Sequence, residues 1–133
     1  MRSDAERLPY MNMKEADWVL RMWRFLDSSK LEKLIVGKER RLWDNTRIDI
    51  LTQNFAIEVD WVNKWAEAIG QSLHYSSVSY KKPGICLLCP DISNEFKYIY
   101  RCSIVAIKYD ISVWLIDTAK SIAILPTGER IKI

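Results

Sequence analysis

Apolar and polar residues alternate along the chain with a period that switches several times between that of a helix and that of a strand. Residues 13–34 have helical periodicity, with an expected apolar stripe of Ala16, Val19, Leu20, Trp23 and Leu26. The sequence Asp27-Ser-Ser favours a kink or break in this helix. Two short apolar runs follow at 47–51 and 55–60, and the tight turn between them predicts an antiparallel hairpin.

The rest of the chain alternates between the two periods. Helical periodicity returns at 61–77 and 94–108. Apolar runs predict strands at 85–89 and 111–116. Strands are also expected at 38–43 and in a closing hairpin at 122–125 and 129–133, and 81–84 predicts a turn. The expected fold class is therefore α/β (α+β), with a central mixed sheet of four to five strands, flanking helices and a C-terminal hairpin.

Length and charge narrow the class of protein. A chain of 133 residues corresponds to one domain, so we expect a single domain over residues 1–133. The net charge of +3 permits a polyanionic partner without requiring one. No apolar run is long enough to span a membrane and no signal-peptide core follows the N-terminus, so we expect an intracellular protein with no membrane partner.

The three cysteines do not predict a metal site. Cys86 and Cys89 are three residues apart on a predicted strand, which directs their sulfur atoms to opposite faces. No second Cys or His pair completes a zinc site. We therefore expect the cysteines to be structural.

Acidic residues inside the two hairpin strands are the main candidates for chemistry. Asp49 and Glu58 each lie between two aliphatic residues, where a buried strand normally carries another aliphatic side chain. An antiparallel hairpin can bring Asp49 and Glu58 together on one face, and Asp60 points to the same face. Three converging carboxylates repel one another unless they hold a cation, and oxygen ligands favour Mg²⁺ or Mn²⁺.

The helix after the hairpin adds polar groups at steps of three and four, namely Lys64, Glu67, Gln71 and His74. Lys64 lies about one turn beyond Asp60 and could orient a water molecule or stabilise negative charge on a phosphoryl group. Gln71 could donate a hydrogen bond to a phosphate. The set fits metal-assisted hydrolysis of a phosphodiester.

Structural roles explain the same residues in another way. Asp49 could form a buried salt bridge with Arg47 or Arg40. Glu58 and Asp60 could face solvent on an edge strand. Lys64 and Glu67 could be a surface pair. His74 is the only histidine, and no nucleophile motif accompanies it, so we expect a polar or solvent-facing residue late in the helix.

Asp49, the sequence Glu58-Val-Asp60 and a helix with Lys64 and Gln71-Ser-Leu-His-Tyr75 resemble the PD-(D/E)XK nuclease superfamily over residues 13–117. The resemblance implies a restriction-endonuclease-like αβββαβ core. It also implies a small bacterial or phage member, located in the cytoplasm of a bacterial cell or a phage-infected host. It assigns Asp49 as the motif aspartate and Glu58 as the motif acidic residue. Gln71 and Tyr75 match a Gln-x-x-x-Tyr motif.

The activity that the resemblance implies is a Mg²⁺-dependent nuclease, acting on DNA as a homodimer. The implied catalytic residues are Asp49, Glu58, Asp60, Lys64 and Gln71. The implied metal ligands are Asp49, Glu58, Asp60 and Glu39, and the implied nucleic-acid contacts are Arg40, Arg41, Arg47, Lys64 and Tyr75. Asp60 replaces the motif lysine, and Lys64 is the candidate replacement. The alternative is a catalytically inactive nucleic-acid-binding or assembly module on the same fold.

Overall fold

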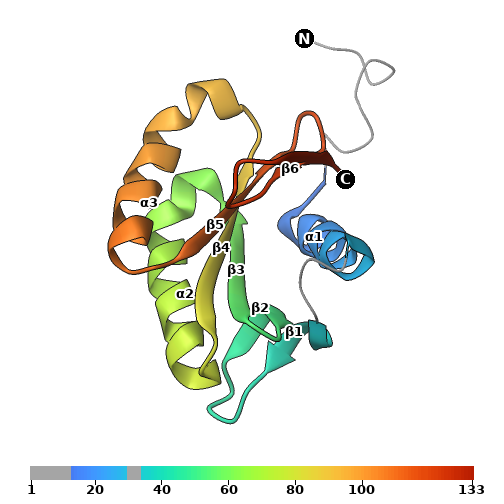
Figure 1. Ribbon diagram of the computed structural model, residues 1–133, viewed down its shortest axis with the longest axis vertical. Helices are drawn as coiled ribbons and strands as arrows, with labels where there is room; N and C mark the ends of the chain where they lie inside the picture. Colours follow the sequence, from blue (N-terminus) through green and yellow to red (C-terminus); the bar gives the residue numbers. More distant parts are fainter. Residues whose placement is uncertain (1–12, 30–33) are drawn as a thin grey trace.

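The computed structural model describes residues 13–29 and 34–133, without the side chains of residues 28–41. In these ranges the chain is a mixed α/β fold, with one sheet that carries helix α1 on one face and helices α2 and α3 on the other (Figure 1). The helices are α1 (Glu15–Ser29), α2 (Trp65–Ser79) and α3 (Phe96–Lys108), with short 3-10 turns at Val62–Lys64 and Ile92–Asn94. The strands are β1 (Leu34–Arg41), β2 (Arg47–Thr52), β3 (Phe55–Trp61), β4 (Lys82–Cys89), β5 (Ser112–Asp117), β6 (Ile122–Ile124) and β7 (Arg130–Lys132).

The seven strands lie in the sheet in the order in which they occur along the chain. The central strands β3, β4 and β5 are parallel, and antiparallel neighbours extend the sheet on both sides. Parallel neighbours need a crossover, which α2 and α3 provide. Both crossovers move in the same direction across the sheet, so their common right-handedness places α2 and α3 on the same face.

Helix α1 packs on the opposite face of the sheet through its own apolar residues. Trp18, Met22 and Leu26 are almost completely buried in a cluster that includes Ile57 and Val59 of β3. The stripe expected from the sequence is only partly correct: Val19 and Leu26 are buried as expected, but the buried face also carries Trp18, Met22 and Phe25, whereas Ala16 is exposed. The large side chains of Trp18 and Met22 offer more apolar area for burial, so the helix is turned to bury them.

The second cluster fills the space between the sheet and helices α2 and α3. It contains Ile85, Leu87 and Cys89 of β4 together with Cys102 and Ala106 of α3. Cys86 belongs to the α1 cluster, which confirms that the two sulfur atoms of the CxxC sequence lie on opposite faces. All three cysteines are free and buried, and burial raises the pKa of each thiol.

The order of helices and strands expected from the sequence is found, including the hairpin of β2 and β3. Several boundaries differ. The first helix ends at Ser29 and the first strand starts at Leu34, four residues before the expected start. The segment 81–84 is not a turn, because β4 begins at Lys82 and pairs with β3 from there. In the described part of the chain, each helix is too short or too polar to cross a lipid bilayer.

Gly84, near the start of β4, packs closely against side chains of the neighbouring strands. A Cβ atom at Gly84 would lie 2.9 Å from the Trp114 ring and 3.1 Å from Ile57. Gly84→Ala should therefore destabilise the fold by about 1–3 kcal/mol, because the surrounding side chains must move. The matched control is Gly70→Ala in α2, which meets nothing within 4 Å and should stabilise the fold by up to about 1 kcal/mol.

Urea denaturation of both variants measures the two free energies of unfolding. Equal effects of the two substitutions would contradict the close packing at Gly84.

Candidate functional site

The candidate site lies where the ladder between β2 and β3 ends. Backbone pairing joins Ile50 to Ile57 and Leu51 to Ala56, and one more step of this register places Asp49 opposite Glu58. At that point the Oδ2 atom of Asp49 accepts a hydrogen bond of 2.8 Å from the Val59 N–H. The Asp49 and Glu58 side chains are also hydrogen-bonded to each other. The two acids that the hairpin was expected to bring together are therefore in contact.

Glu58 is buried in the middle of the sheet, with 7% of its surface exposed. Its neighbour strands are β2 and β4, so the alternative of a solvent-facing glutamate on an edge strand is wrong. The Tyr75 hydroxyl of α2 donates a 3.3 Å hydrogen bond to Glu58 Oε1. Burial, together with the hydrogen bond and the charge of Asp49 and the charge of Asp60, raises the pKa of Glu58 to about 10. Glu58 therefore keeps its proton at neutral pH in the chain alone.

A second carboxyl pair lies beside the first and joins α1 to β3. Glu15, in the first turn of α1, is hydrogen-bonded to Asp60 near the end of β3. Burial and the charges of Asp60 and Asp49 raise the pKa of Glu15 to about 7. The pKa of Asp60 is also raised, chiefly by burial. Four acidic side chains thus interact at one place, contributed by α1, β2 and β3.

Sequence reasoning did not single out Glu15. Its signal was its spacing from the residues that α1 buries, because Glu15 precedes Val19 by four positions and Met22 by seven. This spacing places Glu15 on the side of the helix that meets the sheet. The expected stripe contained Ala16, which is exposed, and lacked Met22, so Glu15 was not recognised.

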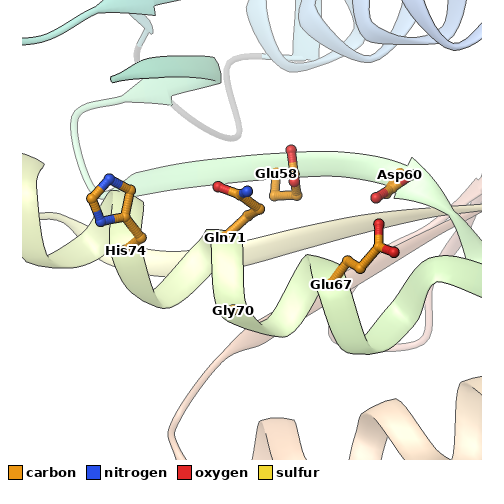
Figure 2. Close-up of a pocket in the computed structure, with 6 residues that line it drawn as sticks. All are labelled: Glu58, Asp60, Glu67, Gly70, Gln71 and His74. Atoms are coloured by element: carbon orange, nitrogen blue, oxygen red, sulfur yellow. The ribbon is translucent and has the colours of Figure 1, made fainter. Parts of the chain in front are cut away.

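A cleft of about 520 Å³ opens next to these carboxylates. Glu58 and Asp60 line it from β3, and α2 contributes the opposite wall, where Glu67 and Gln71 point toward the strand (Figure 2). His74 lines the far end and contacts the turn before β2, with its Nε2 2.9 Å from Thr46 Oγ1. Of the polar face expected for this helix, Glu67, Gln71 and His74 therefore line the cleft, whereas Lys64 does not.

Lys64 lies in the 3-10 turn between β3 and α2 and is exposed. Its positive charge lowers the pKa of Glu15 and that of Asp60, which opposes the effect of burial on both groups. The structure therefore places an ammonium group near the second carboxyl pair. This is the electrostatic position that the sequence predicted for Lys64 relative to Asp60.

The residues that were expected to contact nucleic acid differ in how exposed their side chains are. Arg47 is exposed at the start of β2. Tyr75 is 6% exposed and its hydroxyl binds Glu58, so a direct contact between Tyr75 and a nucleic acid does not fit its burial. The side chains of Glu39, Arg40 and Arg41 lie outside the described residues, although their backbone forms part of β1.

The side chains of the site offer the oxygen donors that a hard cation prefers, but they are not arranged to bind one ion. Among residues 13–29 and 34–133, no three acidic, histidine or cysteine side chains are grouped closely enough to hold a metal ion. The carboxyl groups form two pairs instead, Asp49 with Glu58 and Glu15 with Asp60. All of these donors are oxygen atoms, as Mg²⁺ and Mn²⁺ prefer. Binding of one ion by three of them would require a change of side-chain conformation.

Comparison with known proteins gives no family for this chain. No protein-family model matches it, and no curated protein or solved structure is significantly similar to it. The relation to PD-(D/E)XK nucleases thus stays a prediction from the motif residues.

Glu58→Gln tests the energetic cost of the buried acid. Without added metal at pH 7, the folded chain must hold a proton on Glu58 that the unfolded chain releases, and this opposes folding. Glutamine removes that requirement and can still accept from Tyr75 and donate to Asp49. We expect Glu58→Gln to raise the free energy of unfolding by about 1–3 kcal/mol.

The control is Glu129→Gln at an exposed position, which should change stability by less than about 0.5 kcal/mol. Urea denaturation in the presence of chelator gives both values. A loss of stability in Glu58→Gln would contradict the protonated, buried state of Glu58.

The raised pKa of Glu15 predicts a pH dependence of stability. Between its ordinary value of 4.5 and its folded value of about 7, the folded chain binds more protons at Glu15 than the unfolded chain does. The contribution of Glu15 to stability must therefore fall as pH rises through this window and level off above it, while the contribution of Glu58 continues to fall up to about pH 10. Glu15→Gln should flatten this part of the curve, which melting temperatures between pH 5 and pH 8 in chelator will measure. An unchanged slope in the variant would contradict the interaction of Glu15 with Asp60.

Proposed function

We propose that the chain is a Mg²⁺- or Mn²⁺-dependent nuclease that hydrolyses phosphodiester bonds in DNA. The observation that carries the proposal is the contact between Asp49 and Glu58 at the end of the β2–β3 ladder. Two carboxyl groups in a sheet interior oppose folding, and neither is neutralised by a basic partner in the interactions described above. A ligand that needs both acids explains why the chain carries them.

The surroundings of the pair support the same function. The order α1, β1, β2, β3, α2, β4 is the order of the restriction-endonuclease-like αβββαβ core that the motif residues imply. Asp49 and Glu58 lie on the second and third strands of this order. Gln71 comes from the helix that follows and faces the same cleft.

Lys64 supports catalysis despite the acid at the motif lysine position. Asp60 lies at that position, where its carboxylate cannot stabilise negative charge. Lys64 is four residues further on and already acts on Asp60 and Glu15 through its charge. We therefore assign to Lys64 the part of the motif lysine.

The proposed mechanism gives each side chain a separate task. Asp49 and Glu58 would hold the divalent ion with Asp60 or Glu15, with release of the Glu58 proton, and the ion would polarise the phosphate and lower the pKa of a water molecule. Tyr75 orients Glu58 through its hydrogen bond. The Lys64 ammonium stabilises charge that develops on the phosphate oxygens, and the Gln71 amide donates a hydrogen bond to the phosphate. The water oxygen bonds to phosphorus and gives up a proton to solvent, the bond to the leaving sugar oxygen breaks, and that oxygen takes up a proton from solvent.

A second candidate function is a catalytically inactive nucleic-acid-binding or assembly module. It is favoured by Asp60 at the position of the lysine and by the two-pair arrangement of the carboxyl groups. In that case the acidic residues would have no role in the activity of the protein in its cell.

The test is cleavage of single-stranded, duplex and branched DNA, and of RNA, with Mg²⁺, Mn²⁺ or chelator. We expect metal-dependent cleavage that falls by at least about 100-fold in Glu58→Gln and in Lys64→Ala. Glu129→Gln, at a residue that does not line the cleft, should retain full activity. Because Glu58→Gln is expected to be more stable than the parent chain, unfolding cannot explain its loss of activity.

Calorimetric titration with Mn²⁺ separates the two candidate functions. Mn²⁺ binding that weakens in Glu58→Gln supports the nuclease. Absence of both Mn²⁺ binding and cleavage, with nucleic acid still bound, would contradict the nuclease and support the binding module.

A further inference from the structure

Helix α3 exposes an unusual number of large apolar side chains. Phe96, Tyr100, Ile104 and Ile107, followed by Tyr109, are between 52% and 82% exposed. In the described part of the chain, only two other large apolar residues, Trp43 and Tyr80, are more than half exposed. The four helical positions recur at steps of four and three, so their side chains form one ridge on the helix. We call these five residues the α3 stripe.

The α3 stripe is not needed to attach the helix to the sheet. Cys102 and Ala106, on the other side of α3, are buried in the cluster that packs on β4 and β5. Helix α3 lies in the outer layer with α2, on the side of the sheet away from α1 (Figure 1). The stripe therefore leaves about 600 Å² of apolar side-chain surface in water, taking roughly 200 Å² for each fully exposed side chain. This is at the upper end of what monomers expose.

A groove of about 390 Å³ runs beside the α3 stripe. Its walls are α3 on one side and strands β5 and β6 with the following turn on the other, and its lining is mainly apolar, including Ile99, Val113, Leu115 and Leu125. Ile107 belongs both to the stripe and to the groove. The surface thus presents a ridge and a hollow next to each other, as a self-complementary contact requires.

We propose that the α3 stripe and this groove are the contact between two copies of this chain, related by a twofold axis near Ser103 and Ile104 with the two α3 helices antiparallel. The area supports a second copy, because about 600 Å² of apolar surface plus a polar rim approaches the roughly 800 Å² that each partner buries in a stable complex. Ser103 suits the crossing point, since its hydroxyl is already bonded to the Ile99 carbonyl and its side chain is small.

Charges at the ends of the helix agree with this arrangement. Lys97 and Asp110 are equally far in sequence from the point between Ser103 and Ile104. An antiparallel pair centred there places Lys97 of one copy near Asp110 of the other, at both rims of the contact. A parallel pair would instead place each lysine beside its own counterpart. The charge pattern therefore favours a twofold, antiparallel pair of helices.

The contact is independent of the proposed nuclease activity. The cleft is lined by β3 and α2, and none of its lining residues belongs to the α3 stripe or to the groove beside it. A negative result in the nuclease assay would therefore not contradict the proposed dimer. A monomeric chain would likewise not contradict the proposed nuclease activity of the cleft.

Sedimentation equilibrium of the full chain tests the dimer. We expect a dimer that Ile107→Glu weakens by about 100-fold or more in dissociation constant, because a charge replaces an apolar side chain that belongs to both the stripe and the groove, one helical turn from the axis. The matched control is Tyr80→Glu, which alters an exposed aromatic residue outside the stripe and should leave the dimer intact. Circular dichroism and melting curves check that both variants are folded. A monomer at 100 µM, or a dimer insensitive to Ile107→Glu, would overturn the proposal.

Cysteine cross-linking tests the twofold axis. In an antiparallel pair only a residue close to the axis meets itself, so Ile104→Cys should form an interchain disulfide when a mild oxidant removes two electrons and two protons from the thiol pair. Phe96→Cys should not, because its two copies would be about 22 Å apart along the helices. The native cysteines are buried and give little background.

Efficient cross-linking of Phe96→Cys would overturn the antiparallel arrangement. Lys97, Arg101 and Lys108 beside the stripe could instead serve an anionic partner. A monomeric chain in which Ile107→Glu weakens DNA binding would assign the surface to nucleic acid and overturn the dimer.

Discussion

Asp49 supplies the hydrogen-bond acceptor for the Val59 N–H at the point where the β2–β3 ladder ends. A backbone carbonyl would do this in a continuous sheet, and a side chain that replaces it fixes the position of its own carboxyl group. Glu58 is held between Asp49 and Tyr75 as a consequence. One local contact therefore sets the spacing of the strands, the orientation of both acids and the link from the sheet to α2.

The sheet around this contact tolerates the buried acids because its central strands bury many apolar side chains. Val59 and Leu88 belong to the cluster under α1, while Ile85 and Leu87 belong to the cluster under α2 and α3. Burial of these side chains stabilises the fold by roughly 1.5–3 kcal/mol each, which offsets the cost of keeping a proton on Glu58. The stability of the two apolar layers allows the acids to remain in a place where a strand would gain from an aliphatic residue.

The features that were predictable from the sequence are those set by neighbours along the chain. The hairpin with Asp49 opposite Glu58 follows from strand periodicity and a short turn, and the polar wall of α2 follows from helical spacing. Glu15 and the rotation of α1 were not predictable in the same way, because they depend on which large side chains the sheet accepts. The pairing of the four acids also depends on side-chain conformations, which periodicity does not specify. The exposed ridge of α3 reflects a helix whose apolar residues exceed the area that the sheet covers.

The attachment of α1 by Glu15 has a consequence for the order in which the molecule opens. Asp49 and Glu58 are nine residues apart and come together within one hairpin, whereas Glu15 and Asp60 are 45 residues apart and meet only when α1 docks. Trp18 and Met22 hold the helix to the sheet at any pH, while ionised Glu15 repels the carboxylates beneath it. In alkaline solution α1 should thus be the first helix to exchange its amide hydrogens, ahead of the parallel strands at the centre of the sheet.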